Sequence, residues 1–244
     1  MSIEIKNLSK KFNEVYAVKN INFTINVNKT IGLLGPNGCG KTTSIGMILG
    51  LIKPTTGDII IQNKNINTFE RNKLLNIMNF ASPYVELPKK LSVKQNLQIY
   101  GRLYGVKDLS LRIDELTEDL NLKDFLNKKT GELSSGQKNR VSLAKSLINK
   151  PEILLLDEPT ASLDPDIGDY VRSYVQTYKS KNKVTILLAS HNMAEVERLC
   201  DSVIMMKKGK IIDQGTSKEI INRHGRANLE ETFLKIVRSE DEVA

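Results

Sequence analysis

One stretch decides the fold: TIGLLGPNGCGKTT, residues 30–43. Its beginning, Thr30 to Leu34, is an apolar run of strand length. Residues 35–42 match the pattern G-x-x-x-x-G-K-[ST], in which a glycine-rich loop, the P-loop, cradles phosphate groups. Residues 42–51 then have the pattern of a helix that leaves the loop. Strand, loop and helix in this order predict a nucleotide-binding site in an α/β domain.

The residue types of the P-loop suit the chemistry of a phosphate group. Its glycines let the backbone curl so that several N–H groups point at one anion, and the following helix adds its positive end. We expect Lys41 to reach the β- and γ-phosphates of ATP and the Thr42 hydroxyl to hold Mg²⁺. The helix dipole and Lys41 would lower the pKa of Cys39; the alternative is a small, tolerated side chain. The expected nucleotide-binding residues here are Asn37, Gly38, Cys39, Gly40, Lys41, Thr42 and Thr43.

Two adjacent carboxylates follow a second apolar run. Residues 153–156 precede Asp157 and Glu158, so a central parallel strand is expected to deliver both acids at its carboxyl end, where α/β sheets place ligands. Mg²⁺, held indirectly by Asp157, gives the two acids a reason to coexist, and Glu158 is then free to polarise the attacking water. The alternative is a solvated turn, but the apolar run and the upstream P-loop favour the first interpretation.

Two further segments are weaker signals when taken alone. His191 ends an apolar run, Val184–Ala189, where a γ-phosphate sensor would lie, although a lone histidine is more often structural. Residues 133–137, LSSGQ, supply an N-cap, Ser134, for a lysine- and arginine-rich helix over about residues 136–148. Such a helix start is a second anion site, so the chain carries two phosphate-binding surfaces but one P-loop.

These four segments, in their order along the chain, resemble the ATPase domain of the ATP-binding cassette (ABC) family. The resemblance runs from Lys10 to about Lys210. It implies an enzyme that hydrolyses ATP with Mg²⁺, and it identifies Glu158 and His191 as the catalytic residues, the latter as the family's switch histidine.

The resemblance also implies a dimer. LSSGQ is similar to the family's LSGGQ signature, with Ser135 in place of the first glycine. In the family this surface of one subunit completes the P-loop site of the other, so that two ATP molecules are sandwiched head to tail. Serine adopts positive φ less readily than glycine, but we expect the site to survive. The residues expected at this interface are Ser134, Ser135, Gly136, Gln137 and Asp164, the last in the loop Ser162-Leu163-Asp164.

For the adenine ring, the resemblance points to an aromatic residue in the N-terminal β region. Phe12 matches the family's stacking position, with Val18 as a second contact. Tyr16 is the competitor, and either ring would also suit the core.

The chain departs from the family after Phe80. The family has a glutamine there that contacts Mg²⁺, whereas this chain continues Ala81-Ser82-Pro83, and Gln95 comes too late. One hypothesis is that the Ser82 hydroxyl, or a water, takes the place of the glutamine at Mg²⁺ and that Pro83 stiffens the hinge. The alternative is that this loop contacts only the partner and that water completes the Mg²⁺ shell.

Composition limits the class of protein. The 244 residues allow one substantial core, and 40% apolar with 26% charged residues is ordinary for a soluble globular protein. The sequence has no membrane-spanning run and no signal peptide, and its two cysteines are consistent with a reducing cytoplasm. The net charge of +8 comes from scattered lysines without an aromatic platform, so no nucleic-acid partner is expected.

These segments predict an α/β fold: a P-loop NTPase core with a mainly parallel sheet, a small antiparallel β subdomain and an inserted helical subdomain. We expect a single ABC ATPase domain over 1–244. Its parts are 1–82 and 151–227 (nucleotide-binding core with β subdomain), 83–150 (helical subdomain with the signature) and 228–244 (C-terminal helix and tail). The β subdomain is expected within Ile3–Val27 and Asp58–Gln62. The C-terminal helix would place Leu229, Phe233, Ile236 and Val237 on one face, with His224 at the surface.

The resemblance implies the ATP-hydrolysing subunit of an ABC transporter, which powers export through separate membrane-spanning permease subunits. Its second ATPase subunit is expected to be a copy of itself, on the cytoplasmic face of the cell membrane. Residues 97–106 and the C-terminal helix are similar to the exporter branch of multidrug, antibiotic and lipid or polysaccharide exporters. The alternatives are a non-transport ABC ATPase that acts on a soluble assembly and an ATP-binding regulatory subunit with weak turnover.

Overall fold

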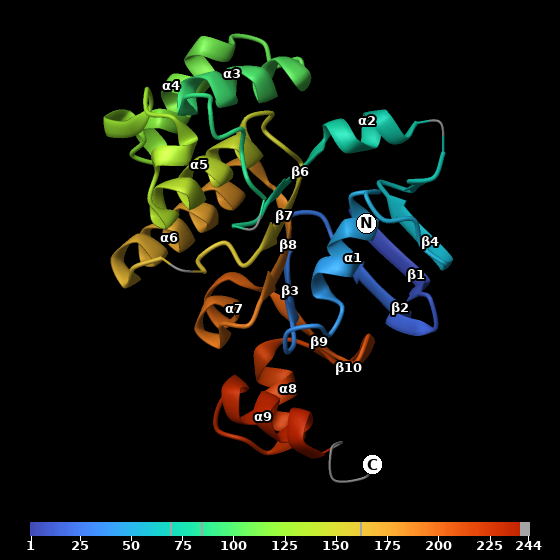
Figure 1. Cartoon of the computed structure of the whole chain (residues 1–244). Coiled ribbons are helices and arrows are strands. Elements are labelled where there is room, and N and C mark those ends of the chain that lie inside the picture. The colour runs from blue at the N-terminus through green and yellow to red at the C-terminus, as the bar shows by residue number, and fades with distance from the viewer. Residues whose placement is uncertain (69, 84, 162, 240–244) are drawn as a thin grey trace. The chain divides into compact units, whose positions relative to one another are not determined.

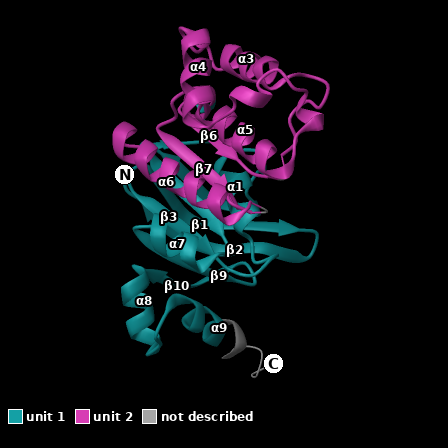
Figure 2. Ribbon diagram, turned by 90° about the vertical axis from the view of Figure 1, so that its left-hand side faces the viewer, with its two compact units in different colours: residues 1–71, 185–244 teal, residues 72–184 magenta. Residues whose placement is uncertain are grey.

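The computed structural model describes residues 1–68, 70–83, 85–161 and 163–239, with side chains as far as residue 236. The chain forms two compact units, residues 1–71 with 185–244, and residues 72–184 (Figure 2). The first unit is thus built from two separate parts of the sequence, and the second is continuous. The single-domain organisation with boundaries near residues 82, 150 and 227 stays a prediction. No helix in the described parts of the chain is long and apolar enough to cross a membrane.

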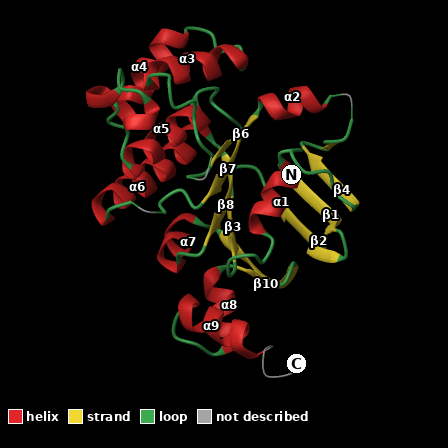
Figure 3. Cartoon of the chain, viewed as in Figure 1, coloured by secondary structure: helices red, strands yellow, loops and turns green. Residues whose placement is uncertain are grey.

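The first unit holds a small antiparallel sheet. Its strands are β1 Ile3–Phe12, β2 Val15–Ile25, β4 Thr56–Ile61 and β5 Lys64–Asn65, in the order β2-β1-β4-β5 (Figure 3). Ile3 pairs with both Ile25 and Ile61, and all three side chains are fully buried. Ile5 and Ile59 repeat the pattern two residues away, because alternate residues of a strand share one face. The antiparallel β layer predicted for this part of the chain is confirmed.

The same unit holds a second sheet, whose strands are β3 Thr30–Leu34, β8 Thr185–Ser190, β9 Ser202–Lys207 and β10 Lys210–Gly215. β3 runs parallel to both β8 and β9, and β10 runs antiparallel to β9. Every residue of β3 and β8 is buried. A parallel strand covered on both faces needs a continuous apolar run, which is why the sequence indicated both strands. Helices α1 Lys41–Ile48 and α7 Met193–Leu199 follow them (Figure 1).

Two C-terminal helices, α8 Ser217–His224 and α9 Leu229–Ser239, pack onto this sheet. The predicted apolar face of α9 is confirmed for Leu229, Phe233 and Ile236, while the side chain of Val237 lies outside the described residues. His224, expected at the surface, is only partly exposed and forms a contact with strand β10. It ends α8 with Nε2 2.8 Å from Asp213 Oδ2, because the end of the helix meets strand β10. The buried cluster beneath these helices consists of Leu34, Val196, Val203, Met205, Ile220, Leu229 and Ile236.

The second unit is mainly helical around one pair of strands. β6 Met78–Ala81 runs parallel to β7 Ile153–Asp157. The inserted helical subdomain is confirmed, and between residues 83 and 150 the described β pairing is an isolated bridge between Ser92 and Lys129. The helical elements are α2 Arg71–Asn76, α3 Val93–Leu103, α4 Leu109–Asp119, η1 Lys123–Phe125, η2 Thr130–Glu132, α5 Ser135–Leu147 and α6 Pro165–Asn182.

Reciprocal capping boxes fix two helix starts in this unit. The Ser92 hydroxyl accepts a hydrogen bond from the Gln95 N–H, and the Gln95 side chain accepts one from the Ser92 N–H. Ser134 and Gln137 form the same pair at the start of α5. Each box satisfies donors that a helix leaves free at its start, and the loss of such an N-cap typically costs about 1 kcal/mol. Gln95 therefore stabilises the start of α3, and Ser134 is the N-cap that the sequence predicted.

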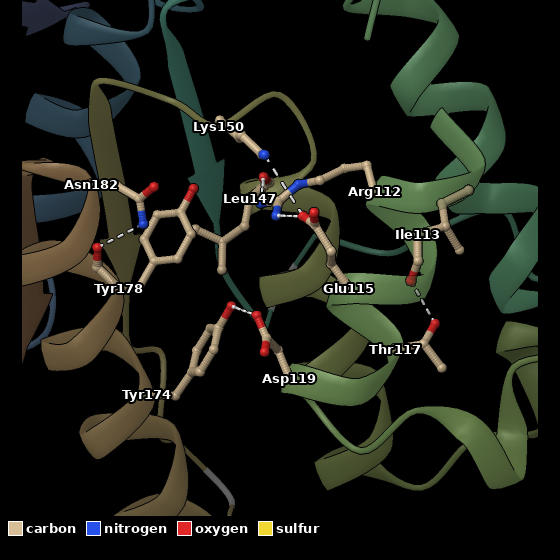
Figure 4. Close-up of polar contacts among 10 residues, drawn as sticks. All are labelled: Arg112, Ile113, Glu115, Thr117, Asp119, Leu147, Lys150, Tyr174, Tyr178 and Asn182. Carbon is tan, nitrogen blue, oxygen red and sulfur yellow. Dashed lines mark hydrogen bonds and ion pairs between the residues drawn. The ribbon is translucent and has the colours of Figure 1, made fainter. Parts of the chain in front are cut away.

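Helices α4, α5 and α6 meet in a cluster of polar contacts (Figure 4). Arg112 of α4 is only 6% exposed; its Nη2 donates to the carbonyl oxygen of Leu147, and its Nη1 lies 2.8 Å from Glu115 Oε2. On α6, the Tyr174 hydroxyl donates to Asp119 Oδ2 at 3.0 Å. Burial, and then the Asp119 carboxylate, raise the pKa of Tyr174, so this hydroxyl keeps its proton and stays a donor.

Candidate functional site

The P-loop connects β3 to α1 in the first unit. Gly38 and Gly40 have positive φ angles, 78° and 109°. A Cβ atom on Gly40 would lie 2.6 Å from the carbonyl oxygen of Ala17, so the turn requires glycine. Gly40 precedes α1 without a side-chain cap, and the first turn of α1 has no acidic residue. The start of α1 therefore suits an anion.

Lys41 points into the P-loop. The residue is 6% exposed, and its Nζ donates to the carbonyl oxygens of Gly35 at 2.6 Å and Pro36 at 3.2 Å. One turn later, Ser44 Oγ donates to the carbonyl oxygen of Gly40 at 2.9 Å. These hydrogen bonds hold the positively charged ammonium group of Lys41 beside the curled backbone of the P-loop.

The P-loop and His191 leave the same edge of the sheet. Leu34, which ends β3, pairs with Ser190, which ends β8. Ser190 Oγ donates to Glu195 Oε2 at 2.6 Å and accepts from the Asn192 N–H at 3.1 Å. The carboxylate of Glu195 is buried, so these bonds fix the turn that carries the exposed His191. Sequence analysis missed Ser190 and Glu195, because no local pattern pairs a serine with an acid five residues later.

The residues expected at the adenine differ in exposure. Phe12 ends β1 with 48% of its surface exposed, and Lys10 Nζ lies 4.8 Å from its ring centroid. Val18 is fully buried, and its Cγ2 would lie 3.1 Å from a Cβ on Gly40. Tyr16 is 43% exposed and faces two lysine ammonium groups. Both rings are thus accessible, while Val18 packs against the P-loop.

Cys39 is buried within the P-loop, at 2% exposure. Burial raises the pKa of its thiol, and the opposing effect of the Lys41 charge is smaller. The expectation of a lowered pKa is therefore wrong, because desolvation outweighs the nearby lysine. The small, tolerated side chain is the interpretation that agrees with the structure.

The second unit brings Ser82 and the two acids to one edge. Ala81 pairs with Leu156, so Ser82 and Asp157 follow at neighbouring strand positions. Ser82, Asp157 and Glu158 are each at most 6% exposed. Glu158 also has a φ angle of 53°, a left-handed conformation that costs a non-glycine residue about 1 kcal/mol or more. Strain and burial at a carboxylate are typical of functional sites, and nothing in the sequence signalled this backbone conformation.

The signature segment, residues 133–137, opens α5 in the same unit. Ser135 is the first helical residue and lacks the positive φ that would favour glycine, so the replacement at this position causes no backbone strain. A cavity of about 320 Å³ has Ser82 and Ser135 in its wall, together with Val85, Leu87 and Val141. The segment after Phe80, which lacks the family's glutamine, and the signature segment therefore line the same pocket.

Asp164 precedes α6 as its N-cap residue, followed by Pro165. Its side chain is exposed and makes no capping hydrogen bond, while its carbonyl oxygen accepts from the Gly168 N–H at 2.8 Å. The preceding Ser162 lies outside the described residues. The Asp164 side chain therefore does not cap α6, as the side chain of an N-cap residue usually does.

Comparison with known proteins defines the class of this protein. Residues 18–161 match the family model described as "ABC transporter". The chain is 34% identical to the ABC transporter ATP-binding protein NatA of Bacillus subtilis, over 97% of this chain and 98% of that protein. It is 34% identical to the Nod factor export ATP-binding protein I of Burkholderia lata, with 90% and 72% covered. It is 32% identical to the spermidine/putrescine import ATP-binding protein PotA of Clostridium acetobutylicum, with 90% and 62% covered.

Solved structures agree with this class. A "Structure of ATP binding subunit of ABC transporter" superposes with a TM-score of 0.90 at 25% identity, covering 98% of this chain and all of that one. The ATP-binding cassette MJ0796, as a dimer in a post-hydrolysis state with ADP and Pi, gives 0.81 at 27% identity, with 88% and 98% covered. The chain belongs to the ABC transporter family. It is the ATP-binding subunit, an ATPase, and its α/β fold is that of the ABC cassette.

Proposed function

We propose that this ATPase powers export through separate membrane-spanning subunits. The observation that carries the proposal is the 34% identity, over 90% of this chain, to a protein named for Nod factor export. PotA, named for import, is also similar, so the proposed direction rests on the match to the Nod factor export protein and on the exporter-like residues 97–106. The subunit would lie at the cytoplasmic face of the membrane, bound through its permease.

We assign a separate task to each residue of the proposed ATP site. Lys41 and the N–H groups of the P-loop bind the phosphates, Phe12 stacks on adenine, and His191 senses the γ-phosphate. Glu158 polarises the attacking water, for which its strained, buried carboxylate is suited. Val18, which is fully buried, packs against Gly40. The remaining nucleotide contacts are assigned to Asn37, Gly38, Cys39, Gly40, Thr42 and Thr43.

Mg²⁺ suits the oxygen donors present. The Thr42 hydroxyl and, indirectly, the Asp157 carboxylate are hard ligands of the kind that this ion prefers. The described residues contain no cluster of three His, Cys, Asp or Glu side chains that would hold a metal by itself. Mg²⁺ usually keeps several waters and is bound through one or two protein oxygens and the phosphates of the nucleotide. Ser82, buried beside Asp157, is the candidate for the position of the missing glutamine.

Two copies of the chain are proposed to close on ATP. The dimeric form of MJ0796 supports this arrangement. The exposed serines of the signature, Ser134 and Ser135, with Gly136 and Gln137, would complete the site of the other copy, and the exposed Asp164 would cross the interface.

The permease is proposed to dock beside the signature helix. The 320 Å³ cavity lies among Ser82, Val85, Leu87 and Val141. Its wall mixes apolar side chains with Glu86, Lys89 and Lys138, as a surface for an amphipathic helix would.

Affinity isolation of the tagged chain from detergent-solubilised native membranes tests the transport proposal. Mass spectrometry should identify a multi-span membrane protein in stoichiometric amount, and that protein's identity would show whether the system exports or imports. Soluble partners alone would favour the non-transport ABC ATPase instead.

Two substitutions test the site. Glu158→Gln should abolish hydrolysis while ATP traps the dimer, and a variant that still turns over would remove Glu158 from its role.

Ser82→Ala should weaken Mg²⁺-dependent hydrolysis. Unchanged turnover would leave the Mg²⁺ shell to water and remove Ser82 from the mechanism.

A further inference from the structure

The signature helix α5 is attached to the strand that leads to Ser82. The Ser142 hydroxyl, on the second turn of α5, donates to the carbonyl oxygen of Ser82 at 3.4 Å. Lys145, one turn further along the same face, reaches the end of β6. The helix that opens with the signature thus contacts the segment that lacks the family's glutamine.

Lys145 makes the densest of these contacts. Its Nζ donates to the carbonyl oxygen of Phe80 at 2.9 Å and to Asn79 Oδ1 at 3.4 Å. The ammonium group also lies 5.4 Å from the ring centroid of Tyr100, on α3. One side chain of α5 is therefore in contact with both β6 and α3.

Asparagine side chains complete the attachment. Asn79, itself 2% exposed, donates from Nδ2 to the carbonyl oxygen of Lys145 at 3.3 Å and to Asn149 Oδ1 at 2.9 Å. Asn149 Nδ2 donates in turn to the carbonyl oxygen of Asn76, just before β6, at 2.8 Å. The bonds run in both directions between α5 and β6, which fixes the register of one against the other.

The charge of Lys145 is held there without an opposite charge. Within the part of the chain that the structure describes, no carboxylate lies within ion-pair distance of its Nζ. Burial lowers the pKa of Lys145 to about 8, with no charged group among the causes. A half-buried cation with no counter-ion costs stability that an apolar residue of the same length would not. Its presence therefore calls for a functional reason.

We propose that Lys145 is a positioning residue, which holds the backbone of Phe80–Ser82 in register with the signature helix so that Ser82 stays correctly placed for hydrolysis. The inference rests on the proposed function of the Ser82 edge. No contact with ATP or with the attacking water is assigned to Lys145; it acts through the carbonyl oxygen of Phe80. The unbranched stem and the ammonium donors are both needed, because the stem crosses the helix–strand contact and the donors bind its far side.

Steady-state hydrolysis by the purified full chain tests this role. Lys145→Met keeps the length but removes the donors, and it should lower kcat by about tenfold with the KM for ATP changed less than about twofold. Lys145→Arg keeps charge and donors and should recover most of kcat. Lys128→Met, at an exposed lysine of the same unit, is the matched control and should behave as the wild type.

Hydrogen exchange without nucleotide gives a second readout that is independent of hydrolysis. In Lys145→Met the amides of residues 80–83 should exchange about tenfold faster than in the wild type, and Lys145→Arg should restore their protection. Lys145→Gln replaces Lys145→Met if the latter does not fold, as judged by circular dichroism.

The two readouts separate the possible failures. Wild-type kcat or unchanged exchange in the Met or Gln variant would overturn the inference. So would an Arg variant as impaired as the Met variant. A wild-type chain without hydrolysis would contradict the proposed function, and the exchange of residues 80–83 would still decide the role of Lys145.

Discussion

Arg112 Nη2 donates a 2.6 Å hydrogen bond to the carbonyl oxygen of Leu147, the last residue of α5 (Figure 4). The last carbonyl groups of a helix have no partner within it, and they carry the negative end of the helix dipole. The Leu147 carbonyl oxygen accepts from this buried guanidinium on α4 and, at 3.1 Å, from the Lys150 N–H that follows the helix. The two helices are thus joined where α5 ends, at the opposite end from the signature.

Replacing Arg112 by methionine should destabilise this junction. The carbonyl oxygen of Leu147 would keep only its weaker donor, the Lys150 N–H at 3.1 Å, and Glu115 would lose its partner at 2.8 Å. We expect the free energy of unfolding to fall by about 2 kcal/mol, because a hydrogen bond from a charged group contributes about that much. Urea unfolding would measure this. Lys128→Met serves as the exposed control, and an Arg112 variant as stable as that control would contradict the role assigned to the bond.

Gly40→Ala should disable the P-loop. The new Cβ would lie 2.6 Å from the carbonyl oxygen of Ala17, at a φ of 109° that alanine rarely adopts. We expect the affinity for ATP to fall by at least about tenfold, measured by calorimetry. Gly168→Ala, within α6 and with its nearest contact a flexible arginine, is the matched control. Wild-type affinity in the Gly40 variant would show that the loop tolerates another backbone path.

Cys39 should be a slow thiol. Burial raises its pKa, so at neutral pH it is mostly protonated, and access is restricted as well. Iodoacetamide labelling followed by mass spectrometry should modify the half-buried Cys200 faster. The rate at Cys39 should rise with pH until well above the ordinary thiol pKa, and bound ATP should slow it further. Equal labelling with and without nucleotide would place Cys39 outside the ATP site.

Lys145 should make stability depend on pH. Its pKa, about 8 against an ordinary 10.5, means that the folded state binds this proton less tightly than the unfolded chain. The penalty is complete below about pH 8 and is relieved as the pH rises toward about 10.5. Relative to Lys145→Met, the wild type should therefore gain up to about 3 kcal/mol across this window. Urea titrations at several pH values would check this, and a constant difference would contradict it.

The two sheets and the edge positions of the site were predictable because each depends on local sequence. Three apolar runs predicted buried parallel strands, one before the P-loop, one before Asp157 and one before His191. The ends of these strands then place those residues. LSSGQ likewise carried its own N-cap in Ser134. These signals lie within a few residues of the feature that they specify.

The unpredicted features depend on residues far apart in the sequence. Lys145 looked like one more solvated lysine of α5, since its partners Phe80 and Tyr100 come from other elements. Of the two interpretations of Cys39, the lowered pKa is wrong and the small, tolerated side chain agrees with the structure, because tertiary burial outweighs the charged neighbour. The left-handed backbone of Glu158 has no sequence signal, since glutamate at positive φ is a strained exception.

Leu34, the last residue before the P-loop, belongs to the same buried cluster as Ile236 of α9. During synthesis Leu34 leaves the ribosome about 200 residues before Ile236. The unit of residues 72–184 is continuous and is able to form while the chain is still growing, whereas the unit with the P-loop waits for its second part. A nascent chain thus has its signature helix before it has a complete P-loop core, and the capacity to bind ATP follows that of forming the helical unit.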